Sequence, residues 1–203
     1  MIAVDCLQGS EQWDEIRRGK PTASCFEKIL TPKTLKLSKQ SVAYQLELIA
    51  QTLPGYAPAL PTFDMQRGSE LEPEAIAKYE FLNDIDVDRI GFVYGNDQRT
   101  WGGSPDGLIG SDGGLETKCP KASTHLEYML KPEVPAKYLP QVWGCLLITG
   151  REWWDWMSFH PELTPVIVRV ERDEQFKKWR DAFLPAIGTF LEQLNELKEK
   201  LTG

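Results

Sequence analysis

The sequence predicts a mixed α/β fold in which helices flank a central β-sheet. Helix-period apolar patterns alternate with short strand-like segments, glycine- and proline-rich turns separate them, and a long amphipathic segment follows the last strand. The predicted order is helices, a strand, a hairpin, a helix, two strands and a final helix. A chain of 203 residues can bury a sizeable core, so we expect one domain over residues 1–203.

The first part of the chain is predicted to be helical. Two short helices are expected within residues 10–30, around the turn RRGKPTAS, and a longer helix over 38–53. The stretch LPGYAPALP, residues 53–61, breaks that helix and forms a loop. The next helix is expected over about 68–82, with Pro73 in its first turn, where proline is tolerated.

The second part of the chain carries the predicted sheet. Strands are expected over 85–94, 101–110, 114–119, 151–159 and 164–171, with a helix over 136–149. In the fourth of these strands, alternation places Trp154 and Trp156 on one face and Trp153 on the other, as expected of a core or interface strand. A long helix is predicted over about 173–201, bent at Pro185.

Composition excludes several classes of protein. The four cysteines form no C-x-x-C pair, which argues against a zinc or iron–sulfur site and for reduced thiols in a cytoplasm. The chain has no apolar run of about 18 residues, and it begins without a signal-peptide pattern, so no membrane association is expected. A net charge of −7 argues against nonspecific coating of nucleic acid. Neither a G-x-S-x-G motif nor a phosphate-binding P-loop is present.

The predicted hairpin at 101–119 carries an unusual set of charges. Glu116 and Lys118 project from one face of a strand, whereas Thr117 belongs to the opposite, buried face. The SDGG turn brings Asp106 towards Glu116, and two converging carboxylates repel each other unless a cation lies between them. Oxygen ligands favour Mg²⁺ or Mn²⁺, and a neighbouring lysine can orient water or stabilise phosphate charge. The alternative is a solvated hairpin with an exposed Glu/Lys pair.

Five ordered motifs distinguish these alternatives. They are QWDEIRRGKPTAS (12–24), RGSELEPEA (67–75), SPDG (104–107), LETKCP (115–120) and LPQVWGCLLITG (139–150). Together they resemble the PD-(D/E)xK nuclease superfamily, and more closely the phage lambda-type alkaline exonucleases, also called YqaJ-like viral recombinases. The resemblance covers about residues 10–180 and implies a restriction-endonuclease-like core.

The resemblance implies roles for six residues of a catalytic site. Asp106, Glu116 and the backbone carbonyl of Thr117 match metal ligands, and Lys118 matches the catalytic lysine. Gln141 matches a glutamine that lies over the active site. Glu72 matches an additional acid on a helix; alternatively, it is a first-turn glutamate favoured by the helix dipole. Two neighbouring acids, Glu70 and Glu74, compete with it for the assignment.

A second set of residues matches a binding site for the DNA 5′-phosphate. Arg17, Ser24 and Ser104 occupy the family positions, and arginine suits phosphate because it forms paired, charge-assisted hydrogen bonds. The alternatives are that RRGK is a solvated turn, that Ser24 only caps a helix and that Arg18 takes the place of Arg17.

The family likeness also implies an activity. The expected enzyme is a Mg²⁺-dependent 5′→3′ exonuclease of phage origin, with two ions, which converts one strand of linear duplex DNA to 5′-mononucleotides. It implies a ring-shaped homotrimer and a single-strand annealing protein as partner in recombination. Candidate DNA-contacting groups are the lysines of TPKTLKLSK and, as strand-separating wedges, Tyr56 or Phe63. The alternatives are an endonuclease or repair nuclease of the same superfamily, and a non-catalytic DNA-end-binding module.

Overall fold

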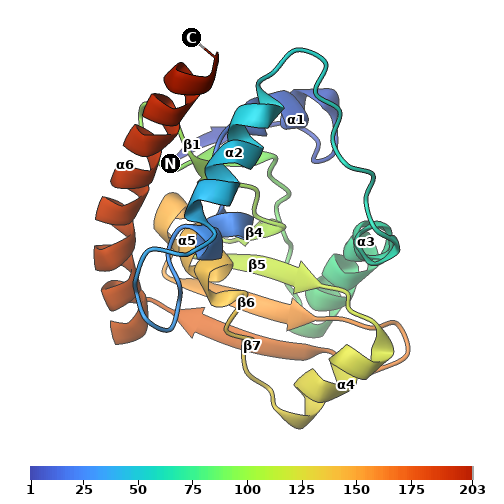
Figure 1. Ribbon diagram of the computed structural model, residues 1–203. Coiled ribbons are helices and arrows are strands. Elements are labelled where there is room, and N and C mark those ends of the chain that lie inside the picture. The colour runs from blue at the N-terminus through green and yellow to red at the C-terminus, as the bar shows by residue number, and fades with distance from the viewer. Residues whose placement is uncertain (203) are drawn as a thin grey trace.

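The computed structural model describes residues 1–202 and has the predicted architecture of mixed sheet and flanking helices (Figure 1). The strands are β1 (Ile2–Val4), β2 (Phe92–Tyr94), β3 (Gly102–Gly103), β4 (Gly107–Ile109), β5 (Gly113–Lys118), β6 (Trp153–Ser158) and β7 (Val166–Glu171). The helices are α1 (Glu11–Arg17), the 3₁₀ helix η1 (Ala23–Lys28), α2 (Ser41–Gln51), α3 (Phe63–Asn83), α4 (Ala122–Leu130), α5 (Leu139–Thr149) and α6 (Glu174–Thr202). Sequence patterns did not predict β1 or α4. No helix within residues 1–202 has the length and apolarity to cross a membrane.

The central sheet has the strand order β4-β5-β6-β7. Its outer pairs, β4–β5 and β6–β7, are antiparallel, and the inner pair β5–β6 is parallel, so the sheet is mixed as predicted. The connection from β5 to β6 contains α4 and α5, as a parallel pair requires. Strands β1, β2 and β3 form a separate antiparallel sheet.

The structure corrects two predicted strands. The expected strand at 85–94 is regular only over Phe92–Tyr94, and the expected strand at 101–110 is divided between the two sheets as β3 and β4. The break falls on Ser104-Pro105-Asp106, where proline cannot donate a ladder hydrogen bond. Both polar side chains of this segment are therefore carried by irregular backbone between the two sheets.

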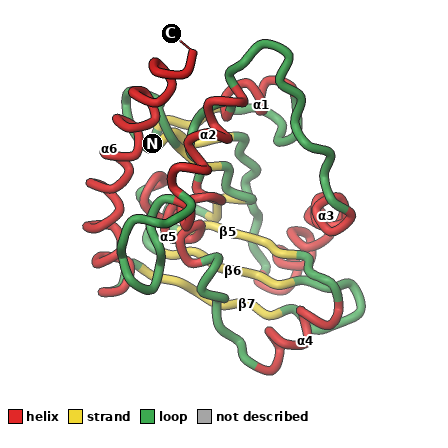
Figure 2. The backbone as a smooth tube through the Cα atoms, viewed as in Figure 1, coloured by secondary structure: helices red, strands yellow, loops and turns green. Residues whose placement is uncertain are grey.

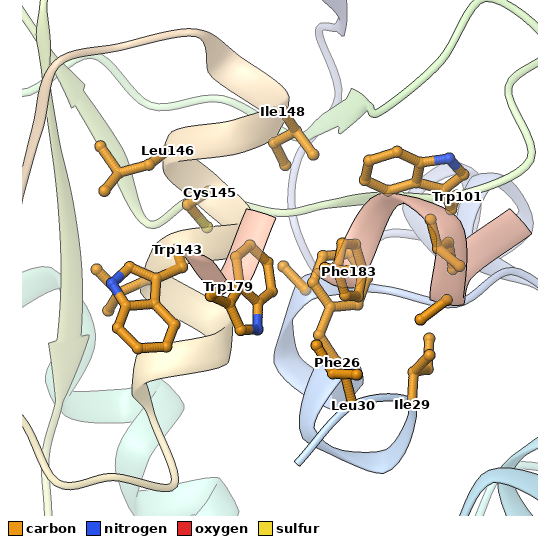
Figure 3. Close-up of a cluster of buried hydrophobic side chains, with 14 of the residues drawn as sticks. Phe26, Ile29, Leu30, Trp101, Trp143, Cys145, Leu146, Ile148, Trp179 and Phe183 are labelled. Carbon is orange, nitrogen blue, oxygen red and sulfur yellow. The ribbon is translucent and has the colours of Figure 1, made fainter. Parts of the chain in front are cut away.

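The two faces of the central sheet pack against different helices (Figure 2). One face, which includes Trp154 and Trp156, joins the main core with η1, α2, α5 and α6; ten of its residues are labelled in Figure 3. The opposite face contributes Leu115 and Met157 to a smaller core that is closed by Tyr79 and its neighbours on α3. The alternation predicted for the tryptophan strand is thereby confirmed.

Two glycines of the SDGG turn permit the close approach of β5 and β6. A Cβ atom on Gly113 would collide with the ring of Trp153, and one on Gly114 with the ring of Trp154. The adjoining loop is fixed by Arg151, whose Nη1 donates to the carbonyls of Ile109, Gly110 and Gly113 at 2.7–3.0 Å. The hairpin that carries the predicted acids is thus held from outside by packing and by carbonyl hydrogen bonds.

Helix α3 begins earlier than predicted, which changes the position of Glu72. The hydroxyl of Thr62 accepts a hydrogen bond from the N–H of Met65 and caps the helix, so Pro73 lies in the helix interior and not in its first turn. Glu72 is likewise far from the helix N-terminus, where the dipole acts. The helix-dipole explanation for Glu72 is therefore wrong. Helix α6 is continuous across Pro185.

Candidate active site

Asp106 and Thr117 meet at the C-terminal part of β5. The Asp106 side chain is 9% exposed, and its Oδ2 accepts hydrogen bonds from the backbone N–H of Thr117 at 2.6 Å and from its hydroxyl at 2.9 Å. The expectation that the Thr117 side chain points away from the site is wrong: it lies on the opposite face of β5 from Glu116, but Asp106 reaches across to it from the segment before β4. These two hydrogen bonds fix the carboxylate of Asp106.

Glu116 and Lys118 form a close ion pair on the face of β5 opposite to Thr117. Lys118 Nζ lies 2.6 Å from Glu116 Oε1, and the side-chain amide of Gln141 donates to the same oxygen at 2.6 Å. Gln141 comes from the first turn of α5, which packs over this face of the sheet. The structure thus brings together the two members of the predicted Glu-x-Lys pair and the predicted glutamine.

The second carboxylate oxygen of Glu116 is buried and has no hydrogen-bond partner among the described residues. Burial, together with the nearby charge of Asp106, raises the pKa of Glu116 to about 8. For Lys118, burial opposes the charge of the ammonium, but the carboxylates of Glu116 and Asp106 outweigh burial and raise its pKa. A buried carboxylate that lacks a partner beside a second carboxylate is an environment that a divalent cation would stabilise.

Glu72 approaches the same place from α3. Glu72, Asp106, Thr117 and Lys118 line one cavity of about 640 Å³. Burial and the charge of Asp106 raise the pKa of Glu72, and Arg89 lies 2.6 Å from its Oε1 and opposes that rise. By contrast, Glu70 and Glu74 are exposed and do not line the cavity, so the structure favours Glu72 over both competitors.

The acids can hold a metal, but they are not arranged as a finished ligand set. Within residues 1–202 no three His, Cys, Asp or Glu side chains cluster in a metal-binding arrangement. Two of the acids have other partners: Glu72 pairs with Arg89, and one oxygen of Glu116 pairs with Lys118. The unpartnered oxygen of Glu116 and the mutual repulsion of the carboxylates are the two observations that fit a cation.

The predicted phosphate-binding residues also converge. Arg17 Nη1 donates to the hydroxyl of Ser104 at 2.9 Å, and the same hydroxyl accepts the indole N–H of Trp13 at 2.8 Å. The guanidinium of Arg17 lies over the Trp13 ring, 4.1 Å from its centroid. Arg17 and Ser24 line a second cavity of about 450 Å³, and Ser24 also lines the first. Arg18 is exposed and makes no such contact with Ser104, which favours Arg17 as predicted.

Three residues of the site were not identified from the sequence. Trp13 supports Arg17, Arg89 pairs with Glu72, and the ring of Tyr138 lies 5.2 Å from Lys118 Nζ. Trp13 lies inside a recognised motif, and Tyr138 immediately precedes another, so both had a signal in the sequence. Arg89 had none, because it comes from an irregular segment outside every motif.

Other predicted DNA contacts remain predictions. The three lysines of TPKTLKLSK are exposed but line neither cavity. Tyr56 lines the second cavity, and Phe63 is 78% exposed at the start of α3. The two histidines, His125 and His160, lie side by side; His125 is fully buried and bonds the Ser158 hydroxyl and the Thr164 carbonyl.

Comparisons with known proteins found one family and several solved structures that match this chain. Residues 12–152 match the model of the YqaJ-like viral recombinase domain. The alkaline exonuclease LHK-Exo from Laribacter hongkongensis superposes with a TM-score of 0.80 at 31% identity, over 94% of this chain and 97% of that one. The same protein in complex with dAMP gives a TM-score of 0.79 at 31% identity, with the same coverage.

A more distant structure shares the fold. A phage-related exonuclease from Haemophilus somnus 129PT gives a TM-score of 0.64 at 17% identity, over 90% of this chain and 98% of that one. Among curated proteins, no sequence matches the chain.

Proposed function

The chain belongs to the YqaJ-like viral recombinase family, and from this membership and the two adjoining cavities we propose that it is a Mg²⁺-dependent 5′→3′ exonuclease acting on linear duplex DNA. The observation that carries the proposal is the buried Glu116 oxygen without a partner, beside Asp106 and Lys118. In the adjoining cavity, which shares Ser24 with the first, Arg17 has no carboxylate within ion-pair distance among residues 1–202. One cavity thus suits a metal and a scissile phosphate, the other a terminal phosphate.

In the proposed site, Glu72, Asp106, Glu116 and the carbonyl of Thr117 hold one or two Mg²⁺ ions, for which Mn²⁺ can substitute. When bound, such ions lower the pKa of water and stabilise negative charge on a phosphate undergoing displacement. The hydrogen bonds from Thr117 to Asp106 and from Gln141 to Glu116 orient the two central carboxylates before any ligand arrives. Preorganised ligands of this kind reduce the reorganisation needed at the moment of reaction.

Lys118 has the second role in the reaction. Its ammonium stays protonated beside Glu116 and Asp106, and it lies at the wall of the cavity, where it can orient the attacking water or bind an oxygen of the scissile phosphate. The neighbouring ring of Tyr138 limits the directions in which the ammonium can turn. Lys118 is therefore assigned to positioning and charge stabilisation.

Arg17, Ser24 and Ser104 give the enzyme its direction. Arg17 and Ser104 are held together by a hydrogen bond and by Trp13, so a 5′-phosphate meets donors already in place. A terminal phosphate held there places the next phosphodiester in the adjoining cavity, and its hydrolysis releases one 5′-mononucleotide. LHK-Exo was solved in complex with dAMP, a nucleotide of this class, which supports that product. The remaining 3′-ended strand would serve phage-type recombination.

Assembly and partners are further parts of the proposal. Membership in the family supports a homotrimer that encircles DNA and a single-strand annealing protein that receives the 3′ strand. Light scattering of the purified chain tests the trimer directly. A monomeric mass at micromolar concentration would remove the ring from the proposal without affecting the chemistry.

The decisive experiment uses linear duplex DNA labelled at either the 5′ or the 3′ end, with Mg²⁺ or EDTA. We expect mononucleotides to appear first from the 5′ label, only with the metal, and faster from phosphorylated than from hydroxyl ends. A covalently closed circle should stay intact. Cleavage of the circle would favour an endonuclease, and DNA binding without cleavage a non-catalytic module.

A further inference from the structure

The cavity that contains Arg17 extends well beyond the groups that would hold one phosphate. Its residues come from α1, the turn after α1, η1, α2, the loop that leads to α3 and the first turn of α3, at the end of the molecule where α1 and α2 lie (Figure 1). Trp13, Ser24 and Met65 line both cavities, so they mark the boundary between them. Arg17 bonds Ser104 and stacks on Trp13, which places its guanidinium at this boundary.

The cavity as a whole is larger than a terminal phosphate requires. The volume of about 450 Å³ lies within the range of about 300–1,000 Å³ of pockets that enclose a whole small molecule. Tyr56 and Pro58 from the loop and Leu48 from α2 add apolar surface to its wall. The backbone N–H of Gly19 donates to the side chain of Gln51 at 2.9 Å, which fixes the turn after α1 against α2.

The cavity also carries three cations, of which the pairing of Arg17 with Ser104 involves only one. Arg17, Arg18 and Lys20 line it, and in the described part of the chain none of the three lies within ion-pair distance of a carboxylate. Of the two acids in the wall, Glu47 is already paired with Lys28 at 2.8 Å, which leaves Asp14 alone. Asp14 offsets one of the three cations, and the net charge of about +2 that remains attracts phosphate groups.

Lys20 is the clearest unexplained group. It is half-buried, and burial lowers the pKa of its ammonium, with no carboxylate close enough to oppose that effect. Burying an unpaired cation costs free energy, which an anionic ligand would recover. Neither the metal site nor the pairing of Arg17 with Ser104 uses this side chain.

We propose that this cavity binds a second phosphate group, attached on the 5′ side of the phosphate held by Arg17, through Lys20 and Arg18. The proposal rests on the exonuclease function above and extends its substrate class to DNA ends that continue past the first phosphate. Two kinds of end supply such a group: a 5′-triphosphate and a 5′ overhang that carries its own terminal phosphate.

The first product distinguishes these two sources. Hydrolysis breaks the bond between the scissile phosphorus and the 3′ oxygen of the released fragment; water supplies hydroxyl to phosphorus and a proton to that 3′ oxygen. A triphosphate end that extends past Arg17 therefore releases a nucleoside 5′-triphosphate. A one-nucleotide overhang that extends in the same way releases a dinucleotide, whereas an overhang held by its terminal phosphate at Arg17 releases a mononucleotide.

The test compares the initial rates of three duplexes that differ only at the 5′ end: a blunt monophosphate, a blunt triphosphate and a one-nucleotide overhang. For the wild-type protein we expect a nucleoside triphosphate or a dinucleotide as first product from the matching extended end. In Lys20→Gln, the ratio of the extended-end rate to the blunt monophosphate rate should fall about tenfold, the worth of one charge-assisted hydrogen bond. Lys178→Gln, at an exposed lysine of α6 outside both cavities, should keep the wild-type ratio.

A binding measurement in EDTA is independent of catalysis. Inorganic pyrophosphate should raise the melting temperature of the wild-type protein more than the same concentration of phosphate, and Lys20→Gln should abolish the difference. The inference is overturned if neither extended end gives its longer product, or if Lys20→Gln leaves both the rate ratio and the pyrophosphate effect unchanged. Failure to cut even the blunt monophosphate duplex would instead contradict the exonuclease function itself.

Discussion

Arg17 and Ser104 are joined by a 2.9 Å hydrogen bond although 87 residues separate them in the chain. The bond connects the end of α1 with the irregular segment between β3 and β4, two residues before Asp106. The proposed phosphate pocket and the proposed metal site are therefore linked through one segment of backbone, which carries both Ser104 and Asp106. This connection gives a physical reason why a terminal phosphate and a scissile phosphate would be held at a fixed separation.

Arg17→Ala should chiefly erase the preference for 5′-phosphorylated over 5′-hydroxyl ends. The guanidinium offers charge-assisted hydrogen bonds worth about 1.5–3 kcal/mol, so the ratio of the two rates should fall about 10–100-fold. Rates on matched duplexes, with melting temperatures to verify folding, measure this. Arg180→Ala, at a half-exposed residue of α6 outside both cavities, is the matched control. If both ends are still cut at their original relative rates, the pocket lies elsewhere.

Asp106→Asn and Lys118→Ala should each abolish digestion while duplex binding persists. Asparagine preserves the shape of Asp106 but removes the charge that would bind a cation, and loss of the lysine removes its positioning role, a change of about 10²–10⁴-fold. Digestion of end-labelled duplex and a gel-shift assay separate chemistry from binding. Undiminished Mg²⁺-dependent cleavage by both purified variants would refute the site assignment.

Glu72→Gln should lower the rate of digestion and the apparent affinity for Mg²⁺. Glu70→Gln and Glu74→Gln should behave as wild type. The three glutamates lie on the same helix, but only Glu72 lines the cavity with Asp106. Titration of the rate with Mg²⁺ gives an apparent affinity for each variant. A stronger effect from Glu70→Gln than from Glu72→Gln would transfer the assignment to the neighbouring acid.

Gln141→Leu should reduce activity or metal affinity by about 10–100-fold, the usual cost of removing a partner of a metal ligand. Its amide donates to Glu116 Oε1 at 2.6 Å, and leucine fills similar space without the donor. Calorimetric titration with Mg²⁺ measures the affinity independently of cleavage. Wild-type affinity and rate in this variant would mean that Lys118 alone orients Glu116.

Without metal, the protein should become less stable as the pH rises from about 5 to about 8. The pKa of Glu116 is raised from 4.5 to about 8 by burial and by Asp106, so the folded state keeps a proton that the unfolded state releases. An acid whose folded pKa is raised contributes full stability below pH 4.5, and this contribution is lost as the pH rises to about 8.

Mg²⁺ should reverse that loss, because a cation stabilises the ionised carboxylate. The rise in melting temperature on adding Mg²⁺ should thus be larger at about pH 8 than at about pH 6. Glu116→Gln should flatten the pH profile in EDTA and abolish the Mg²⁺ effect. A melting temperature that ignores Mg²⁺ at both pH values would argue against the metal site, whatever the activity data show.

The sequence by itself determined the parts of the site that depend on local geometry. Glu116 and Lys118 are two residues apart on a strand, and two-residue periodicity alone places them on one face. The SDGG turn and the register it imposes bring Asp106 towards the same strand. The sheet, the long helices and the tryptophan faces follow from the same periodicities. Resemblance to a known family was needed to add Glu72, Gln141 and Arg17.

Only the tertiary structure decided how the distant segments meet. The capping hydroxyl of Thr62 extended α3 and placed Glu72 in its middle, and Pro105 divided a predicted strand between two sheets. Thr117 bonds Asp106 from the segment before β4, and Arg89 from the segment before β2 pairs with Glu72 on α3. Hydrogen bonds and ion pairs between residues far apart in the chain produce no periodic pattern in the sequence, so they cannot be predicted from it. Only the folded arrangement of Lys118 and Gln141 around Glu116 determines that one of its carboxylate oxygens is bonded and the other is not.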